Sequence, residues 1–457
     1  MYKLDDPCLI EWLKKNHKEI VFTRALPYEI HGRAEKLVNN IGKLDSKKEL
    51  YEQKGTVTEI WRALLGKAIV YLKFKDDREK HHDDEDYGVD KLEDFFTTFD
   101  DFEPLLYGAE EEHYRDHMAH MLSVFLIGEL LIKDTIGFDK IDAGDKKFPN
   151  SNKICPEEKE AMWCIMSLTH DLGIALERIV AISPKCRDML VKYGVINVQE
   201  LAYPFFPLPL HDFMIKFISS DLEPLAGKGE KRYNTHIHAK YFLKFSEAYE
   251  KRDHGIISCL VLMKNLVYFL ESDYLLDLQK PLNSEEAKQF LIRRNILRTI
   301  AAHSNENIYY LTLPQFPFLL SIFDELHEWG RPKLVEMFQR EKLKKTVVVK
   351  ELTYASIYYE VVFKSSSRTL APEDVCRVRK EIFRFFKRRC EKIRRILRSA
   401  VGGEDRNLKL TFEVSDQLEP EAISYKIIHE TPEKVKYFED KHEITWLQLS
   451  EKLEELK

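Results

Sequence analysis

Apolar residues recur every three or four positions along most of the first three quarters of the chain. Residues 11–74 show this spacing, with breaks at Pro27 and Gly42, and residues 95–335 form the longest region that keeps it. No alternation typical of a strand interrupts that second region. Because this period places apolar side chains on one face of an α-helix, the sequence predicts an N-terminal helical layer followed by an all-helical region.

Beyond Lys345 the spacing changes to every second residue. Residues 354–363 and 408–414 alternate in this way, which predicts strands with one buried face. Residues 372–399 lie between them and carry an apolar stripe at helical spacing, made of Ile382, Phe386, Cys390, Ile393 and Leu397. A helix with such a stripe can cover a sheet, so the sequence predicts a small α+β C-terminal domain.

The chain of 457 residues is long enough for two or three domains. A segment dense in charge, residues 75–92, is too polar to pack and is predicted to be an exposed linker. We therefore expect three parts. These are residues 1–92 with the N-terminal helices and linker, residues 93–340 with the central helical domain, and residues 341–457 with the α+β domain.

Composition narrows the class of protein. Charged residues make up 32% and hydrophobic residues 44%, as in a soluble globular protein, and the net charge of −6 gives no general attraction to nucleic acid or membrane. The N-terminus lacks the apolar core of a signal peptide and no stretch is apolar enough to span a membrane, so we expect a cytoplasmic protein. Seven scattered cysteines without a CxxC pair argue against a disulfide framework or a zinc knuckle.

Histidines in the central region follow a pattern that suits metal binding. His113, His117 and His120 are spaced to lie on one face of a predicted helix. About fifty residues later, His170 and Asp171 are adjacent at the end of a strongly apolar helix and precede a glycine turn. An imidazole nitrogen and a carboxylate oxygen that splay from a helix end can both reach one divalent ion. This pair is the first candidate for a metal site.

The order of the motifs resembles the HD superfamily of metal-dependent phosphohydrolases over residues 110–335. Members bind metal through a helical His, an adjacent His-Asp pair and a distant helical Asp, and here Val124 follows the first His at the family's spacing of four. The positions that match these ligands are His120, His170, Asp171 and Asp324. Two more match the additional histidines of binuclear members, His254 and His303. The resemblance implies an all-helical bundle, and hence a mainly α chain with the smaller α+β domain at its end.

The resemblance also implies a cofactor. Four imidazoles and two carboxylates suit Mn, Fe, Co, Ni or Zn better than Ca, and Mg is compatible with them. We expect two divalent ions, which would polarise a phosphoryl oxygen and generate hydroxide near neutral pH. His170 and Asp171 are the expected catalytic residues, with Asp171 bridging the ions and orienting the attacking water. A single ion with one substrate-facing histidine is the alternative, and His117 is a candidate hydrogen-bond partner of a ligand.

Two departures from the family pattern limit the choice of substrate. Many catalytic members carry a Lys where this chain has Ile174, so a basic residue that stabilises phosphoryl charge must come from elsewhere. Candidates are Arg178, Lys240, Arg252 and Arg331. The Gly-Tyr-Pro element of cyclic-di-GMP phosphodiesterases is missing after His303, so that substrate is not expected.

These features predict an enzyme that hydrolyses a phosphoester of a nucleotide or oligonucleotide. The alternative is a non-catalytic ligand-binding sensor or scaffold of the HD type that signals through the C-terminal domain. A further partner, nucleic acid, could bind the basic face of the helix at residues 372–399, although a solvated face is the competing interpretation. That face carries Arg384, Lys387, Arg388, Lys392, Arg395 and Arg398. A homo-oligomer is also left open, and no membrane partner is expected.

Overall fold

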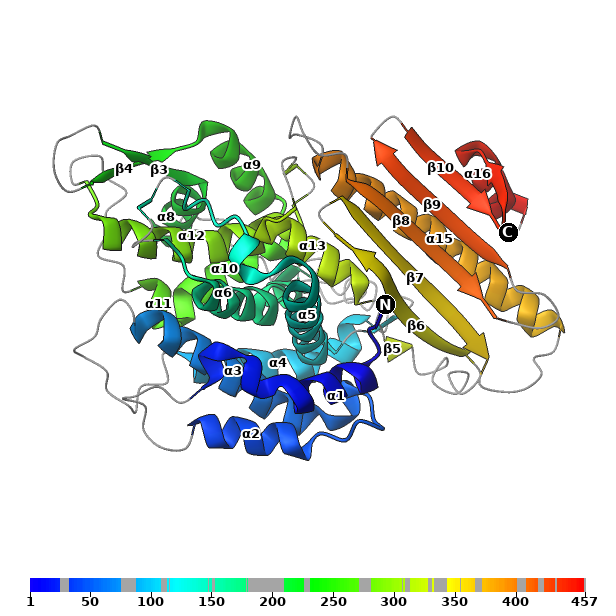
Figure 1. Ribbon diagram of the computed structural model, residues 1–457, viewed down its shortest axis with the longest axis horizontal. Helices are drawn as coiled ribbons and strands as arrows, with labels where there is room; N and C mark the ends of the chain where they lie inside the picture. The colour runs from blue at the N-terminus through cyan, green and yellow to red at the C-terminus, as the bar shows by residue number, and fades with distance from the viewer. Residues whose placement is uncertain are drawn as a thin grey trace, which may run out of the picture.

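A computed structural model of the chain shows a mainly helical fold beside a C-terminal sheet (Figure 1). The residues that it describes are 1–24, 33–74, 88–107, 113–114, 116–146, 148–149, 153–177, 179, 209–225, 231–270, 281–305, 307–308, 313–327, 331–332, 343–353, 355–365, 372–400, 408–417, 423–431 and 434–455. The predicted mainly α class is confirmed in this part of the chain. Among the described helices, none is both long enough and apolar enough to cross a membrane.

Three N-terminal helices form the predicted helical layer. They are α1 (Asp6–Asn16), α2 (Arg33–Lys43) and α3 (Lys54–Phe74). The side chain of Asp5 caps α1 by accepting a hydrogen bond from the backbone N–H of Cys8, which satisfies one of the donors that a helix start leaves unpaired. The indole N–H of Trp61 in α3 donates to the carbonyl of Leu168 at 2.8 Å. This bond ties the layer to the helix that ends at the predicted metal site.

The central region contains the helices that carry the candidate ligands. They are α4 (Val89–Tyr107), α5 (His117–Leu131), α6 (Pro156–Thr169), α8 (Pro209–Ser219), α9 (Ala239–Glu250), α10 (His254–Asn265), α11 (Val267–Leu270), α12 (Ser284–His303) and α13 (Phe316–Leu326). Every residue of α5 is buried, so this helix lies at the centre of the bundle, where a helix is apolar on all sides.

The prediction that residues 95–335 are wholly helical is wrong in two places. Strands β2 (His113–Tyr114) and β5 (Arg331–Pro332) pair, and β3 (Ser220–Pro224) pairs with β4 (Tyr233–Ile237), each antiparallel. Strands of two to five residues are too short to produce a clear alternation. His113 therefore lies in β2, and not on the helix of His117 and His120 as predicted.

The predicted linker also needs correction at its end. Residues 75–87 lie outside the described residues, but α4 begins at Val89, and Val89 and Leu92 are buried. The start of α4 is amphipathic. Its charged residues made the segment look like a linker, although a helix needs only every third or fourth residue to be apolar.

The C-terminal region forms a seven-stranded sheet in the order β1-β6-β7-β8-β9-β10-β11. Its strands are β1 (Tyr2–Lys3), β6 (Leu343–Leu352), β7 (Ser356–Ser365), β8 (Lys409–Asp416), β9 (Ser424–Thr431), β10 (Lys434–Glu439) and β11 (His442–Ile444). The parallel pair β7 and β8 is connected through α15 (Pro372–Ala400), and α16 (Trp446–Glu455) follows β11. The predicted strands and helix are thus confirmed.

Packing in this region follows the predicted stripe, with Phe386 of α15 stacked on Phe412 of β8 at 5.6 Å between ring centroids. The sequence did not foresee β1, in which Tyr2 pairs with Val349 of β6. The N-terminus therefore lies at the sheet (Figure 1). The division into three domains stays a prediction. Strand β1 at the N-terminus belongs to the C-terminal sheet, so the first and last predicted domains are in contact.

Candidate metal centre

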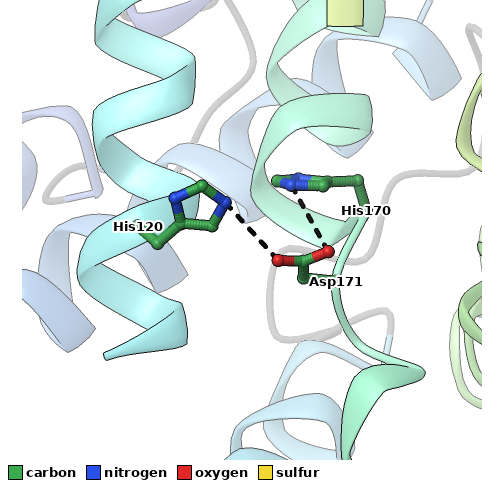
Figure 2. A group of neighbouring side chains, drawn as sticks. All are labelled: His120, His170 and Asp171. Atoms are coloured by element: carbon green, nitrogen blue, oxygen red, sulfur yellow. Dashed lines mark ion pairs between the residues drawn. The ribbon is translucent and has the colours of Figure 1, made fainter. Parts of the chain in front are cut away.

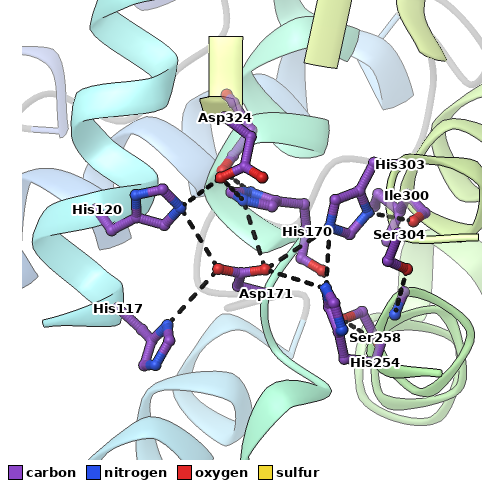
Figure 3. A network of polar contacts seen from close by, with 12 residues as sticks. His117, His120, His170, Asp171, His254, Ser258, Ile300, His303, Ser304 and Asp324 are labelled. Atoms are coloured by element: carbon purple, nitrogen blue, oxygen red, sulfur yellow. Dashed lines mark hydrogen bonds and ion pairs between the residues drawn. The ribbon is translucent and has the colours of Figure 1, made fainter. Parts of the chain in front are cut away.

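Five helices bring seven titratable side chains together in the core of the bundle (Figure 3). Helix α5 supplies two of them, the end of α6 two, and α10, α12 and α13 one each. They are His117, His120, His170, Asp171, His254, His303 and Asp324. All six predicted ligands therefore lie at one place, together with His117, the predicted partner of a ligand.

Asp171 lies in the middle of this cluster, with histidines on both sides (Figures 2 and 3). Its Oδ2 atom is 3.4 Å from His120 Nε2 and 3.6 Å from His117 Nδ1. Its Oδ1 atom is 3.6 Å from the Nε2 atoms of both His170 and His254. His303 Nε2 is 3.7 Å from the same oxygen. Both oxygens of this one carboxylate therefore face imidazoles, two at Oδ2 and three at Oδ1.

The cluster divides into two overlapping groups of donor atoms. Atoms of His120, His170 and Asp171 lie within 4.8 Å of one another, and so do atoms of Asp171, His254 and His303. Asp324 joins the first group, because its Oδ1 atom is 2.9 Å from His120 Nε2 and 3.8 Å from His170 Nε2. We call the group with Asp324 the first half-site and the group with His254 and His303 the second half-site. Each could hold a metal ion.

Hydrogen bonds to backbone carbonyls orient two of the imidazoles. His170 Nδ1 is 2.9 Å from the carbonyl oxygen of Ser167, and His303 Nδ1 is 2.6 Å from that of Ile300. Since a carbonyl can only accept, each Nδ1 carries the hydrogen and donates it. In the neutral ring the Nε2 atom then carries the lone pair and points to Asp171, which is the tautomer that a metal ligand needs.

His254 is oriented in the same way by a carboxylate. Its Nδ1 atom is 2.9 Å from Glu177 Oε2, and its Nε2 atom is 3.3 Å from His303 Nε2. Burial alone would lower the pKa of His254, but the hydrogen bond to Glu177 and the charge of Asp171 raise it to about 9, whereas burial lowers the pKa of His303. Two imidazole nitrogens at this distance repel unless a proton or a cation lies between them. Metal binding here would release a proton.

The chemistry of the donor set fits a metal. Burial alone would raise the pKa of Asp171, but the charge of His170 and the polar contacts with His117 and His303 at 3.6 and 3.7 Å hold it well below its usual range. A lowered pKa favours the ionised carboxylate, which is the form that binds a metal. Within the described part of the chain, neither Asp171 Oδ2 nor His170 Nε2 has a hydrogen-bond partner although both atoms are buried. Buried polar atoms without partners are costly, and a cation would satisfy both.

Close backbone packing holds the His-Asp turn against α10. The N–H of Gly173 donates to Ser258 Oγ at 2.7 Å, and the same hydroxyl lies 2.7 Å from the carbonyl oxygen of His170. A Cβ atom at Gly173 would lie only 2.1 Å from the carbonyl oxygen of His254. The glycine after the His-Asp pair is thus required by the approach of α10, and this approach brings His254 to Asp171.

Sequence reasoning missed two side chains that hold the imidazoles. His327 is buried, its Nδ1 atom is 2.6 Å from His120 Nδ1, and the two rings stack at 4.8 Å. Glu177 holds His254 as described above. His327 follows Asp324 by three residues and Glu177 follows Asp171 by six, so helical spacing from the ligands was the signal that could have identified His327.

The basic residues predicted to bind phosphate stay untested. Arg178 lies outside the described residues, and Arg331 lies in β5 with a side chain that is not described. Arg252 is half-buried two residues before His254, in the left-handed region with φ 59°. Lys240 is exposed on α9.

Part of the basic face of α15 packs within the C-terminal region. The ammonium group of Lys387 lies 5.9 Å from the centre of the Trp446 ring in α16, while Arg388 is exposed. Packing against a ring is the usual use of such a side chain. Nucleic-acid binding by this face stays a prediction.

Replacing Glu177 by Gln is expected to weaken metal binding at the second half-site by about 10- to 100-fold, the range found for partners of metal-ligating histidines. The amide oxygen can still accept the hydrogen bond of His254, but the negative charge that makes the imidazole more basic is lost. Calorimetric titration of the metal-free protein with Mn²⁺ measures the effect. Glu247→Gln is the control, because Glu247 is in an ion pair with Lys251 on α9. If both variants bound two equivalents of Mn²⁺ with the same affinity, Glu177 would have no role in metal binding through His254.

Comparison of the chain with models of protein families, with curated proteins and with solved structures gave no match.

Proposed function

We propose that the chain is a metal-dependent phosphohydrolase of the HD superfamily that acts on a phosphoester of a nucleotide or oligonucleotide. One observation carries the proposal: a single buried carboxylate, Asp171, shares two groups of donor atoms with histidines, and each group could hold one divalent ion. The order of the motifs along the chain supports the same class. Structural metal sites usually need four ligands, so a six-ligand cluster favours catalysis.

The proposal assigns the ligands to two ions. His120, His170 and Asp324 would hold the first, His254 and His303 the second, and Asp171 both. Bound divalent ions supply Lewis-acid activation of a phosphoryl oxygen and lower the pKa of water. His170, His254 and His303 each donate their Nδ1 hydrogen to a fixed acceptor, so their Nε2 atoms are already oriented before an ion binds.

The chain's own residues also set the direction from which a substrate arrives. The His254 side chain is 23% exposed and that of His303 is 2%, while Asp171 is 4% exposed. The buried floor of the cluster excludes water, and the side of His254 is the more open one. A phosphoester would therefore approach beside His254, with the ionised Asp171 beneath it to orient an attacking water.

The competing function is a ligand-binding sensor or scaffold of the HD type that signals through the C-terminal domain without hydrolysis, with or without a structural metal. Ile174 favours it, because an apolar side chain stands where many catalytic members carry a Lys. Bound metal is compatible with both functions, so hydrolysis is the property that separates them.

A panel of nucleotides, cyclic nucleotides and short RNA and DNA oligonucleotides, incubated with the purified protein and Mn²⁺, tests the proposal. We expect metal-dependent release of phosphate or of a nucleoside monophosphate from at least one class, abolished by a chelator and restored by Mn²⁺. Full metal loading without hydrolysis of any compound would favour the sensor instead.

A further inference from the structure

The last turn of α13 holds both ring nitrogens of one proposed ligand. Asp324 Oδ1 lies 2.9 Å from His120 Nε2 (Figure 3), and His327 Nδ1 lies 2.6 Å from His120 Nδ1. His120 cannot turn about its Cβ–Cγ bond without losing one of these contacts. The orientation of this imidazole therefore depends on where the last turn of α13 lies.

That turn is tied to the C-terminal region by an ion pair. Glu325, between Asp324 and His327, has a side chain that is 2% exposed and pairs with Arg389 of α15, which is 11% exposed. A buried carboxylate needs such a partner, because removing one member of the pair leaves an uncompensated charge. Both side chains are nearly buried, so the pair can persist only while the end of α13 stays against α15.

The position of the turn matters because α13 ends there. Leu326 is its last residue, and the backbone of His327 leaves the helical region with ψ 76°. A terminal turn lacks the hydrogen bonds that hold the middle of a helix. Successive helical residues point about 100° apart, so Glu325 can reach α15 while Asp324 faces α5, and any shift of one moves the other.

We propose that Arg389 is a positioning residue of the metal centre: by holding Glu325 it fixes the last turn of α13, so that Asp324 and His327 clamp His120. The C-terminal region is then part of the machinery that builds the first half-site. This inference rests on the proposed metal centre, and it adds a residue more than sixty positions beyond the last ligand.

An ion pair that only docks α15 on the bundle would affect stability without affecting metal affinity. The chain offers a matched control for this possibility. Arg379, also on α15, has its Nε atom 3.1 Å from Oδ2 of Asp416, a carboxylate that is 2% exposed. Asp416 belongs to β8 within the C-terminal sheet. Removing Arg379 therefore disturbs the same helix and a similar pair without touching α13.

The experiment compares Arg389→Ala and Arg389→Lys with Arg379→Ala and Arg379→Lys in the full chain. Metal-free proteins are titrated with Mn²⁺ against a chelator of known affinity, and their thermal unfolding is recorded. We expect Arg389→Ala to bind one of the two equivalents about 10- to 100-fold more weakly and Arg389→Lys to recover part of the loss. Both Arg379 variants should bind as the wild type does. If Arg389→Ala does not fold, the two Lys variants carry the comparison.

Two results would overturn the inference alone: wild-type affinity in the Arg389 variants, or an equal loss in the Arg379 variants. Absence of metal from the wild type would instead overturn the metal centre, and the inference with it. A selective loss of affinity in the Arg389 variants, in a protein that hydrolyses nothing, would support the positioning role and count against the enzyme.

Discussion

Asp171→Asn is expected to lower the rate of hydrolysis by at least about 10³-fold, equivalent to about 4 kcal/mol of transition-state stabilisation. The carboxylate lies within 3.7 Å of imidazoles of both half-sites, so the substitution weakens the binding of both ions and removes the negative charge between them. The amide keeps the size of the side chain, which separates this effect from a packing defect. Initial rates with excess Mn²⁺, together with metal content after gel filtration, measure it.

A buried aspartate outside the cluster provides the control for this variant. Asp145 is 7% exposed, and its Oδ2 atom accepts a hydrogen bond from the N–H of Ile154 at 2.9 Å. Asp145→Asn should retain the wild-type rate within a few-fold and bind the same amount of metal. A wild-type rate in Asp171→Asn would show that this carboxylate takes no part in the reaction.

Gly173→Ala is expected to lower the free energy of unfolding by about 1–3 kcal/mol, the usual cost of overpacking, and to lose the metal of the second half-site. The added Cβ would lie 2.1 Å from the carbonyl oxygen of His254 and 2.7 Å from the backbone nitrogen of Ser258. Both are backbone atoms, so α10 has to move away, and His254 moves with it. Thermal unfolding and metal titration report the two effects separately.

Gly66→Ala is the matched substitution, because a Cβ at this position in α3 meets nothing within 4 Å. Alanine is the better helix former, so this variant should be as stable as the wild type or more so, with unchanged metal binding. Wild-type stability and metal content in Gly173→Ala would mean that α10 is not held against the His-Asp turn as described.

Three of the candidate ligands lie at helix ends in the structure. His170 caps the C-terminus of α6, His254 opens α10 and His303 closes α12. The six ligands could be predicted because their order along the chain resembles a family pattern, and burial in apolar helices brings them to one place. The predicted strands and the helix of residues 372–399 could also be predicted from the sequence, since one face of each is wholly apolar.

The partners of these ligands could not be predicted, because they depend on contacts between distant segments. His327 meets His120 across 207 positions of the chain, and Arg389 reaches Glu325 from a different region. Strand β1 has two residues, too few for any periodic signal, yet it joins the C-terminal sheet. Helix α5 has no polar face, so its orientation in the bundle could not be predicted from amphipathicity.

Elemental analysis of the purified wild-type protein, after removal of metals and reconstitution with Mn²⁺, tests the central claim most directly. The account predicts close to two equivalents per chain, and close to one when His254 and His303 are both replaced by Ala, because these residues belong to the second half-site alone. No manganese above background in the reconstituted wild type would contradict it.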